Sequence, residues 1–224
     1  MDVWTELGRG FTPEGDELLL RARSGHFELR MNGQELMASR AHESEEAMAR
    51  WACAHLAGTE AARVLIGGLG FGYTLRAALD SLPATARVVV AELIPEVVAW
   101  VRGPVAELAG DPLGDPRVEV RIADAGEMLR QSAGGFDAIV LDIDNGPEEP
   151  VRPGNAASFG AKGLAAIRRA LRPGGVLSIW SADPAAGFEE RLRQAGFQVE
   201  KRDCPALPDR GGASHTVYLA RIGV

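Results

Sequence analysis

Acidic and amide side chains gather at one point of the chain, directly after an apolar run. The run Ala138-Ile-Val-Leu141 has the composition of a buried β-strand, and Asp142, Asp144 and Asn145 follow it. A carboxylate at the end of such a strand could hold an amine, accept its proton and balance a nearby positive charge. Asp and Asn also favour turns, so a purely structural role is the alternative. We predict Asp142 and Asp144 as catalytic residues, either of which is the base, and Asn145 as a substrate contact.

A glycine-rich loop follows an earlier apolar run, Val64-Leu-Ile66. Because glycine has no Cβ, its backbone can approach a ligand closely, and the helix that follows presents free N–H groups to the loop. The spacing departs from the G-x-G-x-x-G dinucleotide pattern, since Tyr73 stands at the third position. A ligand-free turn between strand and helix is the alternative. We predict a ligand-binding loop formed by Gly68, Gly70, Phe71 and Gly72.

Two further acids each follow a predicted strand. Glu92 comes about 20 residues after the glycine loop, where a carboxylate can accept hydrogen bonds from both hydroxyls of a ribose. Asp124 could accept a hydrogen bond from an adenine amino group, while the backbone N–H of Ala125 meets a ring nitrogen. Asp124 could equally cap the next helix, and the two roles are compatible. Leu93 is expected to flank the adenine.

These groups need strands and helices that bring them together. From about residue 61 the two kinds of element alternate, which predicts an α/β fold with a doubly wound parallel sheet. The predicted strands cover residues 63–66, 87–92, 117–122, 136–141 and 175–180, and the predicted helices cover 72–81, 95–109, 125–132, 159–171 and 184–195. Two final strands, 197–201 and 215–221, have no helix between them and should form an antiparallel hairpin. Ligands of such sheets bind at the carboxyl ends of the strands, where the acids and the glycine loop would meet.

The first residues of the chain have a different pattern. Strands over 17–23 and 26–31 are joined by Ser24-Gly25, and Asn32-Gly33 leads into a third over 34–37. We expect a small antiparallel sheet of two or three strands, which has to pack on the main domain to be stable. The predicted division is a β unit over residues 1–42 and a Rossmann-like domain over 43–224, in which 43–58 form a connecting helix.

Composition narrows the function. The chain has 224 residues and a net charge of −7, a balance that does not favour a nucleic-acid partner. No apolar stretch of ~20 residues predicts a membrane span, and the first residues lack a signal-peptide pattern. The two cysteines and four histidines show neither disulfide nor metal-ligand spacing. We expect a cytoplasmic protein without a metal, nucleic-acid or membrane partner.

The glycine spacing and the terminal hairpin resemble those of class I S-adenosylmethionine-dependent transferases. A longer set of motifs resembles the spermidine synthase (aminopropyltransferase) branch of that family: Val64-Leu-Ile-Gly-Gly68, Thr74-Leu-Arg76, Val90-Ala-Glu-Leu-Ile-Pro-Glu-Val-Val98, Asp115-Pro-Arg-Val-Glu-Val120, Asp124-Ala125, Phe136-Asp-Ala-Ile-Val-Leu-Asp142 and Leu171-Arg-Pro-Gly-Gly-Val-Leu177. The resemblance implies a nucleoside site on the glycine loop, Glu92 and Asp124. It also implies a catalytic aspartate at Asp142, a polyamine-type substrate and a homodimer.

The sequence departs from that family in the part of the site that binds the aminopropyl group. Where the family has an aspartate that grips the amine of the donor, this chain has Phe71. The family's Gln, Asp-Glu pair and Tyr are not kept in residues 36–46, and we assign Glu43 and Glu46 there to the substrate. These departures favour methyl transfer from S-adenosylmethionine to a small-molecule amine. The alternatives are aminopropyl transfer from decarboxylated S-adenosylmethionine and a non-catalytic oligomer; Tyr73 and the hairpin disfavour a nicotinamide oxidoreductase.

Overall fold

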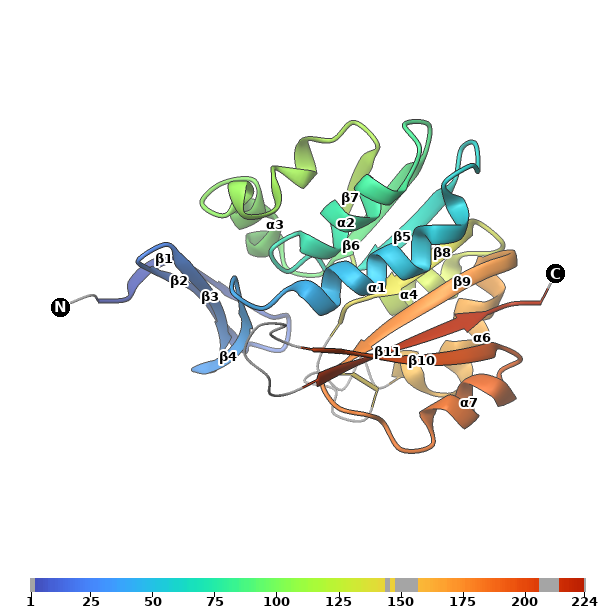
Figure 1. Ribbon diagram of the computed structural model, residues 1–224. Helices are drawn as coiled ribbons and strands as arrows, with labels where there is room; N and C mark the ends of the chain where they lie inside the picture. The colour runs from blue at the N-terminus through green and yellow to red at the C-terminus, as the bar shows by residue number, and fades with distance from the viewer. Residues whose placement is uncertain (1–2, 144–145, 148–156, 206–213, 224) are drawn as a thin grey trace.

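The computed structural model describes residues 3–143, 146–147, 157–205 and 214–223, which form two β-sheets and the helices around them (Figure 1). The larger sheet has the order β10-β11-β9-β8-β5-β6-β7. Its strands are β5 (Arg63–Gly67), β6 (Arg87–Glu92), β7 (Val118–Ile122), β8 (Phe136–Leu141), β9 (Leu171–Ser181), β10 (Gln198–Pro205) and β11 (Ser214–Arg221). Strands β5 to β9 are parallel, and β10 and β11 form an antiparallel hairpin beside β9. The predicted doubly wound, Rossmann-like α/β fold with a terminal hairpin is confirmed.

Side chains along each central strand alternate between the two faces of this sheet. Val64 and Ile66 of β5 belong to one hydrophobic cluster and Leu65 belongs to the other. The first cluster includes α1 (Glu43–Cys53), α2 (Tyr73–Ser81) and α3 (Pro95–Val101), and the second includes α4 (Ala125–Gln131), α6 (Ala161–Ala170) and α7 (Phe188–Gln194). Because helices cover both faces, the central strands are apolar throughout, as their sequences indicate.

The N-terminal sheet has four antiparallel strands where the sequence predicts two or three. They are β1 (Thr5–Phe11), β2 (Glu17–Arg23), β3 (His26–Met31) and β4 (Gln34–Ala38), paired in chain order. Strand β1 was missed because Gly8 and Gly10 lower its β propensity. The tertiary structure explains why a residue without a side chain stands at position 8: a Cβ on Gly8 would lie 2.3 Å from Trp100 Nε1 of α3. This close packing of β1 on α3 joins the small sheet to the larger domain (Figure 1).

Two helix boundaries differ from the prediction. Helix α3 ends at Val101 and not near residue 109, because a Gly-Pro pair follows it and proline restricts the residue before it. Short 3₁₀ turns cover Ala54–Leu56, Ala106–Ala109 and Pro112–Gly114. Helix α7 begins at Phe188, after Gly187 with φ of +71°. The division into domains at residue 42 stays a prediction.

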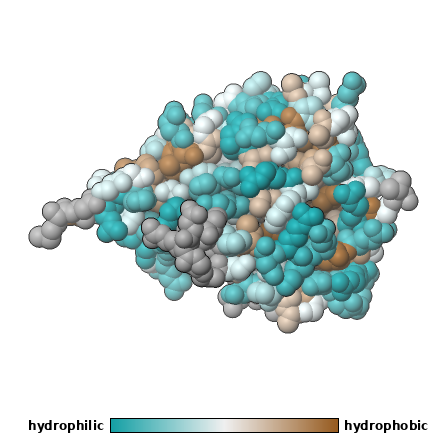
Figure 2. Space-filling view, in the orientation of Figure 1, coloured by the Kyte–Doolittle hydropathy of each residue, from teal (hydrophilic) through white to brown (hydrophobic). Residues whose placement is uncertain are grey.

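The surface seen in Figure 2 is mostly hydrophilic, with hydrophobic residues in small separate patches. The apolar side chains are instead concentrated in the two clusters that flank the larger sheet. Among the described residues, none of the helices has the length and apolar character needed to cross a membrane.

Candidate functional site

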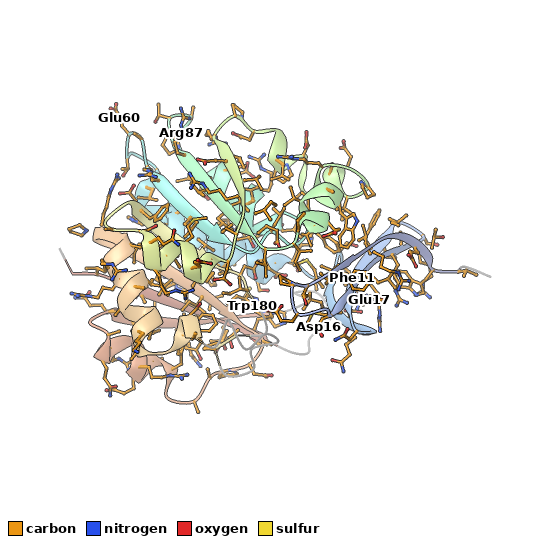
Figure 3. The ribbon with its side chains drawn as sticks, turned by 180° about the vertical axis from the view of Figure 1, so that it is seen from behind. Phe11, Asp16, Glu17, Glu60, Arg87 and Trp180 are labelled. Carbon is orange, nitrogen blue, oxygen red and sulfur yellow. The ribbon has the colours of Figure 1, made fainter. Side chains whose placement is uncertain are left out.

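A cavity lies between the carboxyl ends of the parallel strands and the N-terminal sheet. The sheet side contributes Gly68, Leu69, Gly70, Ala91, Glu92, Leu93, Ile94, Ala123, Asp124, Ala125, Asp142 and Ile143; the small sheet and its neighbours contribute Thr12, Leu18, Leu29, Met31, Leu36 and Met37. Glu45 of α1 and Trp180 of β9 complete the walls together with Val97. Figure 3 shows Trp180 at the end of its strand, on the side of the N-terminal sheet. Seven predicted residues therefore meet in one cavity: Gly68, Gly70, Glu92, Leu93, Asp124, Ala125 and Asp142.

The glycine loop and Asp142 are fixed against each other by the backbone. Gly68 has a φ of +87°, and a Cβ there would lie 2.2 Å from the carbonyl oxygen of Asp142. The N–H of Asp142 donates to the carbonyl of Gly67 at 2.9 Å, and the N–H of Gly68 donates to Ala91 at 3.0 Å. Only glycine combines this conformation with so close an approach, so position 68 sets where Asp142 stands.

Glu92 holds the loop from the other side. Its carboxylate is buried and accepts hydrogen bonds from the N–H groups of Leu69, at 2.9 Å, and Ile94, at 2.8 Å. Each carboxylate oxygen can accept more than one hydrogen bond, so this anchoring role is compatible with the predicted ribose contact. Asp124 caps α4 by accepting from the N–H of Glu127 at 2.7 Å, and it also lines the cavity. The roles of both acids toward a nucleoside stay predictions.

Asp142 faces a second carboxylate, that of Glu45, which is not among the residues predicted from the sequence. Thr74 Oγ1 donates to Asp142 Oδ2 at 2.6 Å, and Glu45 from α1 lines the same cavity. Burial raises the pKa of Glu45 to about 7, and the negative charge of Asp142 adds to the shift. Burial also raises the pKa of Asp142 to about 6, against the opposing effect of the Thr74 hydrogen bond. The pair therefore holds a proton near neutral pH, and it can bind a cation or exchange a proton with a ligand.

Glu45 does not stand out in the sequence because three acids, Glu43, Glu45 and Glu46, stand in the first turn of α1. Its side chain is buried, since it lies three residues before Met48 on the face that packs toward the sheet. Glu43 and Glu46, which we had assigned to the substrate, do not line the cavity. Glu46 instead contacts His42 and Arg50. The spacing from Met48 was the signal that could have separated these acids.

Phe71 and Gly72 pack against other parts of the protein. Phe71 is buried in the hydrophobic cluster beneath the loop, edge-to-face with Tyr73, and does not line the cavity. Gly72 begins α2 with a φ of +90°, and a Cβ there would lie 2.8 Å from Pro112. Neither residue is part of the cavity lining, and their assignment to the cofactor stays a prediction. Asp144 and Asn145 lie outside the described residues.

The charge of the cavity is one-sided. Four described lining residues have ionisable carboxylates, namely Glu45, Glu92, Asp124 and Asp142, and the described lining includes no Lys, Arg or His. A cationic ligand would gain attraction from these groups, whereas an anionic group would meet repulsion without a basic partner.

Replacing Glu45 by glutamine should flatten the dependence of stability on pH. The pKa of about 7 in the folded chain lies above the value of about 4.3 for an unfolded glutamate, so the folded state binds more protons between these values. Wild-type stability should therefore fall as pH rises from 5 to 8, and Glu45→Gln should recover about 1–3 kcal/mol at pH 8 relative to pH 5. Denaturant unfolding at several pH values measures this. Glu46→Gln, outside the cavity, should keep the wild-type slope; an unchanged slope in Glu45→Gln would contradict the burial of this charge.

Comparisons with known proteins give three findings. The sequence profile of the family described as "Spermine/spermidine synthase domain" matches residues 44–192. The chain is 34% identical over 145 residues to a polyamine aminopropyltransferase of Mycobacterium tuberculosis, an alignment that covers 61% of this chain and 27% of that protein. It is 35% identical over 128 residues to a polyamine aminopropyltransferase of a Synechococcus species, covering 57% and 39%. The chain thus spans well under half of the length of these relatives.

Solved structures show the same fold. The spermidine synthase of Thermotoga maritima matches with a TM-score of 0.74 at 20% identity, over 98% of this chain and 73% of that one. A probable spermidine synthase of Corynebacterium glutamicum matches with a TM-score of 0.62 at 19% identity, over 99% and 81%. The predicted spermidine synthase-like branch of the class I S-adenosylmethionine fold is confirmed by the matched profile and these neighbours together.

Proposed function

Because the chain belongs to the spermine/spermidine synthase family, we propose that it transfers the aminopropyl group of decarboxylated S-adenosylmethionine to an amine acceptor. The names of the relatives support aminopropyl transfer, which is the alternative predicted from the sequence. Nothing in the comparisons supports methyl transfer, the reading that the sequence favoured. That preference depended on Phe71 facing the donor, and Phe71 is buried away from the cavity.

The observation that carries the proposal is the set of four acids in a cavity whose described lining has no basic side chain. Decarboxylated S-adenosylmethionine has a sulfonium and an ammonium group, two positive charges that these acids can balance. S-adenosylmethionine adds a carboxylate, for which the described lining offers no cation. Glu45 and Asp142 thus supply the negative charge that the family places at the position of Phe71.

The reaction requires a group that accepts a proton from the acceptor amine and residues that hold the donor in place. An acceptor amine is protonated at neutral pH, with a pKa of about 10.4 for a lysine-like amine, and it must lose a proton before its nitrogen can attack. Asp142 takes that proton. The nitrogen then forms a bond to the propyl carbon next to the sulfonium, the carbon–sulfur bond breaks, and its electron pair stays on sulfur as a neutral thioether. Glu92 holds the ribose, and Leu93, Asp124 and Ala125 hold the adenine.

Donor choice tests this function. We expect decarboxylated S-adenosylmethionine to bind at least about tenfold more tightly than S-adenosylmethionine, or about 1.4 kcal/mol, in titration calorimetry. Glu45→Gln should reduce this preference, whereas Glu46→Gln on the same helix should leave it unchanged. Labelled donor and a panel of amines should then give a neutral thioether nucleoside. Equal or tighter binding of S-adenosylmethionine would return the assignment to methyl transfer.

A homodimer and a cytoplasmic location stay predictions from the sequence. The acceptor is proposed only as an amine, since the acids that face the cavity favour a cation but do not set its length. The apolar side chains that the N-terminal sheet contributes, such as Leu18, Leu29 and Met31, would contact methylene groups between the charges of such an acceptor.

A further inference from the structure

The proposed reaction releases one proton into the cavity. An ammonium acceptor and a doubly charged donor carry three positive charges together, and the extended product carries two beside a neutral thioether. One proton must therefore leave in each turnover. Asp142 and Glu45 can receive it, but both must discharge it before the next acceptor binds.

A buried hydroxyl, that of Ser44, links Glu45 to a histidine outside the cavity lining. Ser44 Oγ lies in hydrogen-bond contact with Glu45 Oε2, with His215 Nδ1 at 2.8 Å and with Trp180 Nε1 at 3.0 Å. Ser44 is 1% exposed, whereas His215 at the start of β11 is partly exposed. The three contacts thus lead from a carboxylate in the cavity to a ring near the surface.

The donors and acceptors of this cluster allow two arrangements. The indole N–H of Trp180 can only donate, so it always occupies one lone pair of the Ser44 hydroxyl. In the first arrangement the Ser44 hydroxyl donates to His215 Nδ1, and a protonated Glu45 donates to Ser44 Oγ. In the second arrangement the Ser44 hydroxyl donates to Glu45, and an N–H on His215 Nδ1 donates to Ser44 Oγ. The two arrangements differ by the transfer of one proton from Glu45 to His215.

We propose that Ser44 and His215 form a proton exit, which carries the proton of the acceptor amine from the Asp142–Glu45 pair to solvent. The inference rests on the proposed aminopropyl transfer. Protonated Glu45 gives its proton to Ser44 Oγ as Ser44 gives its own to His215 Nδ1, and the imidazolium then loses the proton of its other nitrogen. Every bond broken is an N–H or O–H bond replaced by another, and no electron is gained or lost.

The surroundings of His215 suit such a role. Burial lowers the pKa of His215, with Asp183 acting in the opposite direction, so the ring is neutral at pH 7 and can accept a proton. Trp180 packs edge-on against the ring, with centroids 4.7 Å apart, and fixes its orientation. Trp180 thereby positions His215 and Ser44 at the same time.

The test compares Ser44→Ala and His215→Phe with the double variant, in steady-state turnover over a range of substrate concentrations. His215→Phe keeps a ring against Trp180 and removes both nitrogens. We expect each single variant to lower kcat about 10²-fold while kcat/KM is kept, because release of the proton follows the transfer step. The double variant should be no slower, since the two groups act in series, and imidazole in the buffer should restore much of the rate in His215→Phe. His26→Phe, on an exposed hairpin position, is the matched control and should behave as wild type.

Wild-type rates in both single variants would overturn the proton exit while leaving aminopropyl transfer intact. A loss in His215→Phe that adds fully to that of Ser44→Ala and is insensitive to imidazole would also overturn it, because a structural defect would behave in that way. If the wild-type protein transfers no aminopropyl group to any amine, the proposed function fails first, and that result is seen before any variant is made.

Discussion

Asp142→Asn should lower the turnover of aminopropyl transfer by about 10²–10⁴-fold, or ~3–5 kcal/mol in the barrier, while donor affinity changes only a few-fold. Asparagine has nearly the same shape, and its amide oxygen can still accept the hydrogen bond from Thr74 Oγ1. What it loses is the capacity to accept the proton of the acceptor amine. Steady-state kinetics with the best amine from a screen, together with calorimetry of donor binding, measures the two effects separately.

Asp144→Asn is the companion variant, because the sequence left either acid as the base. If Asp142→Asn turns over like wild type while Asp144→Asn is inactive, the base is Asp144. If neither change affects turnover, the acceptor needs no base, and the proposed role of the Asp142–Glu45 pair is wrong. Raising the pH should not restore Asp142→Asn fully, since the variant also lacks the carboxylate that orients the acceptor amine.

Gly68→Ala should destabilise the protein by about 2–4 kcal/mol and abolish donor binding in the molecules that stay folded. The added Cβ would have a φ of +87° and would lie 2.2 Å from the carbonyl oxygen of Asp142. The overlap is with backbone, so it can be relieved only by separating the glycine loop from the end of β8. Urea unfolding gives the loss of stability, and calorimetry gives the loss of binding.

Gly33→Ala is the matched control for backbone strain. Gly33 has a similar φ of +80°, but nothing lies within 4 Å of a Cβ built there. The control should lose only the conformational part, about 1–2 kcal/mol, and should bind donor normally. Equal losses of stability and normal binding in both variants would mean that the close approach of Gly68 to Asp142 has no part in forming the site.

Much of the fold follows from local patterns that the sequence displays directly. Apolar runs such as Ala138-Ile-Val-Leu141 predict strands buried on both faces, and the missing helix between the last two strands predicts their hairpin. Acids that directly follow these runs are predicted to lie close together, because parallel strands end at the same edge of a sheet. Glu92, Asp124 and Asp142 line one cavity for this reason.

The sequence was weaker wherever a residue's environment comes from a distant segment. Gly8 reads as a weak strand residue, and only the nearby ring of Trp100 explains why the strand needs it. Phe71 occupies a family ligand position in the alignment, yet burial in the cluster beneath the loop directs it away from the cavity. The spacing of residues along the loop does not show which of its side chains are buried against another element.

What the sequence by itself determined is therefore the sheet, the glycine loop and the three acids at strand ends, because periodicity and strand direction are local or repeated properties. What only the tertiary structure decided is which acid of α1 enters the cavity and what it contacts there. Glu45 meets Asp142 and, through Ser44, His215, which is distant in the chain. Such contacts depend on the rotation of α1 on the sheet and on the path of β11, which are set by the packing of the whole core.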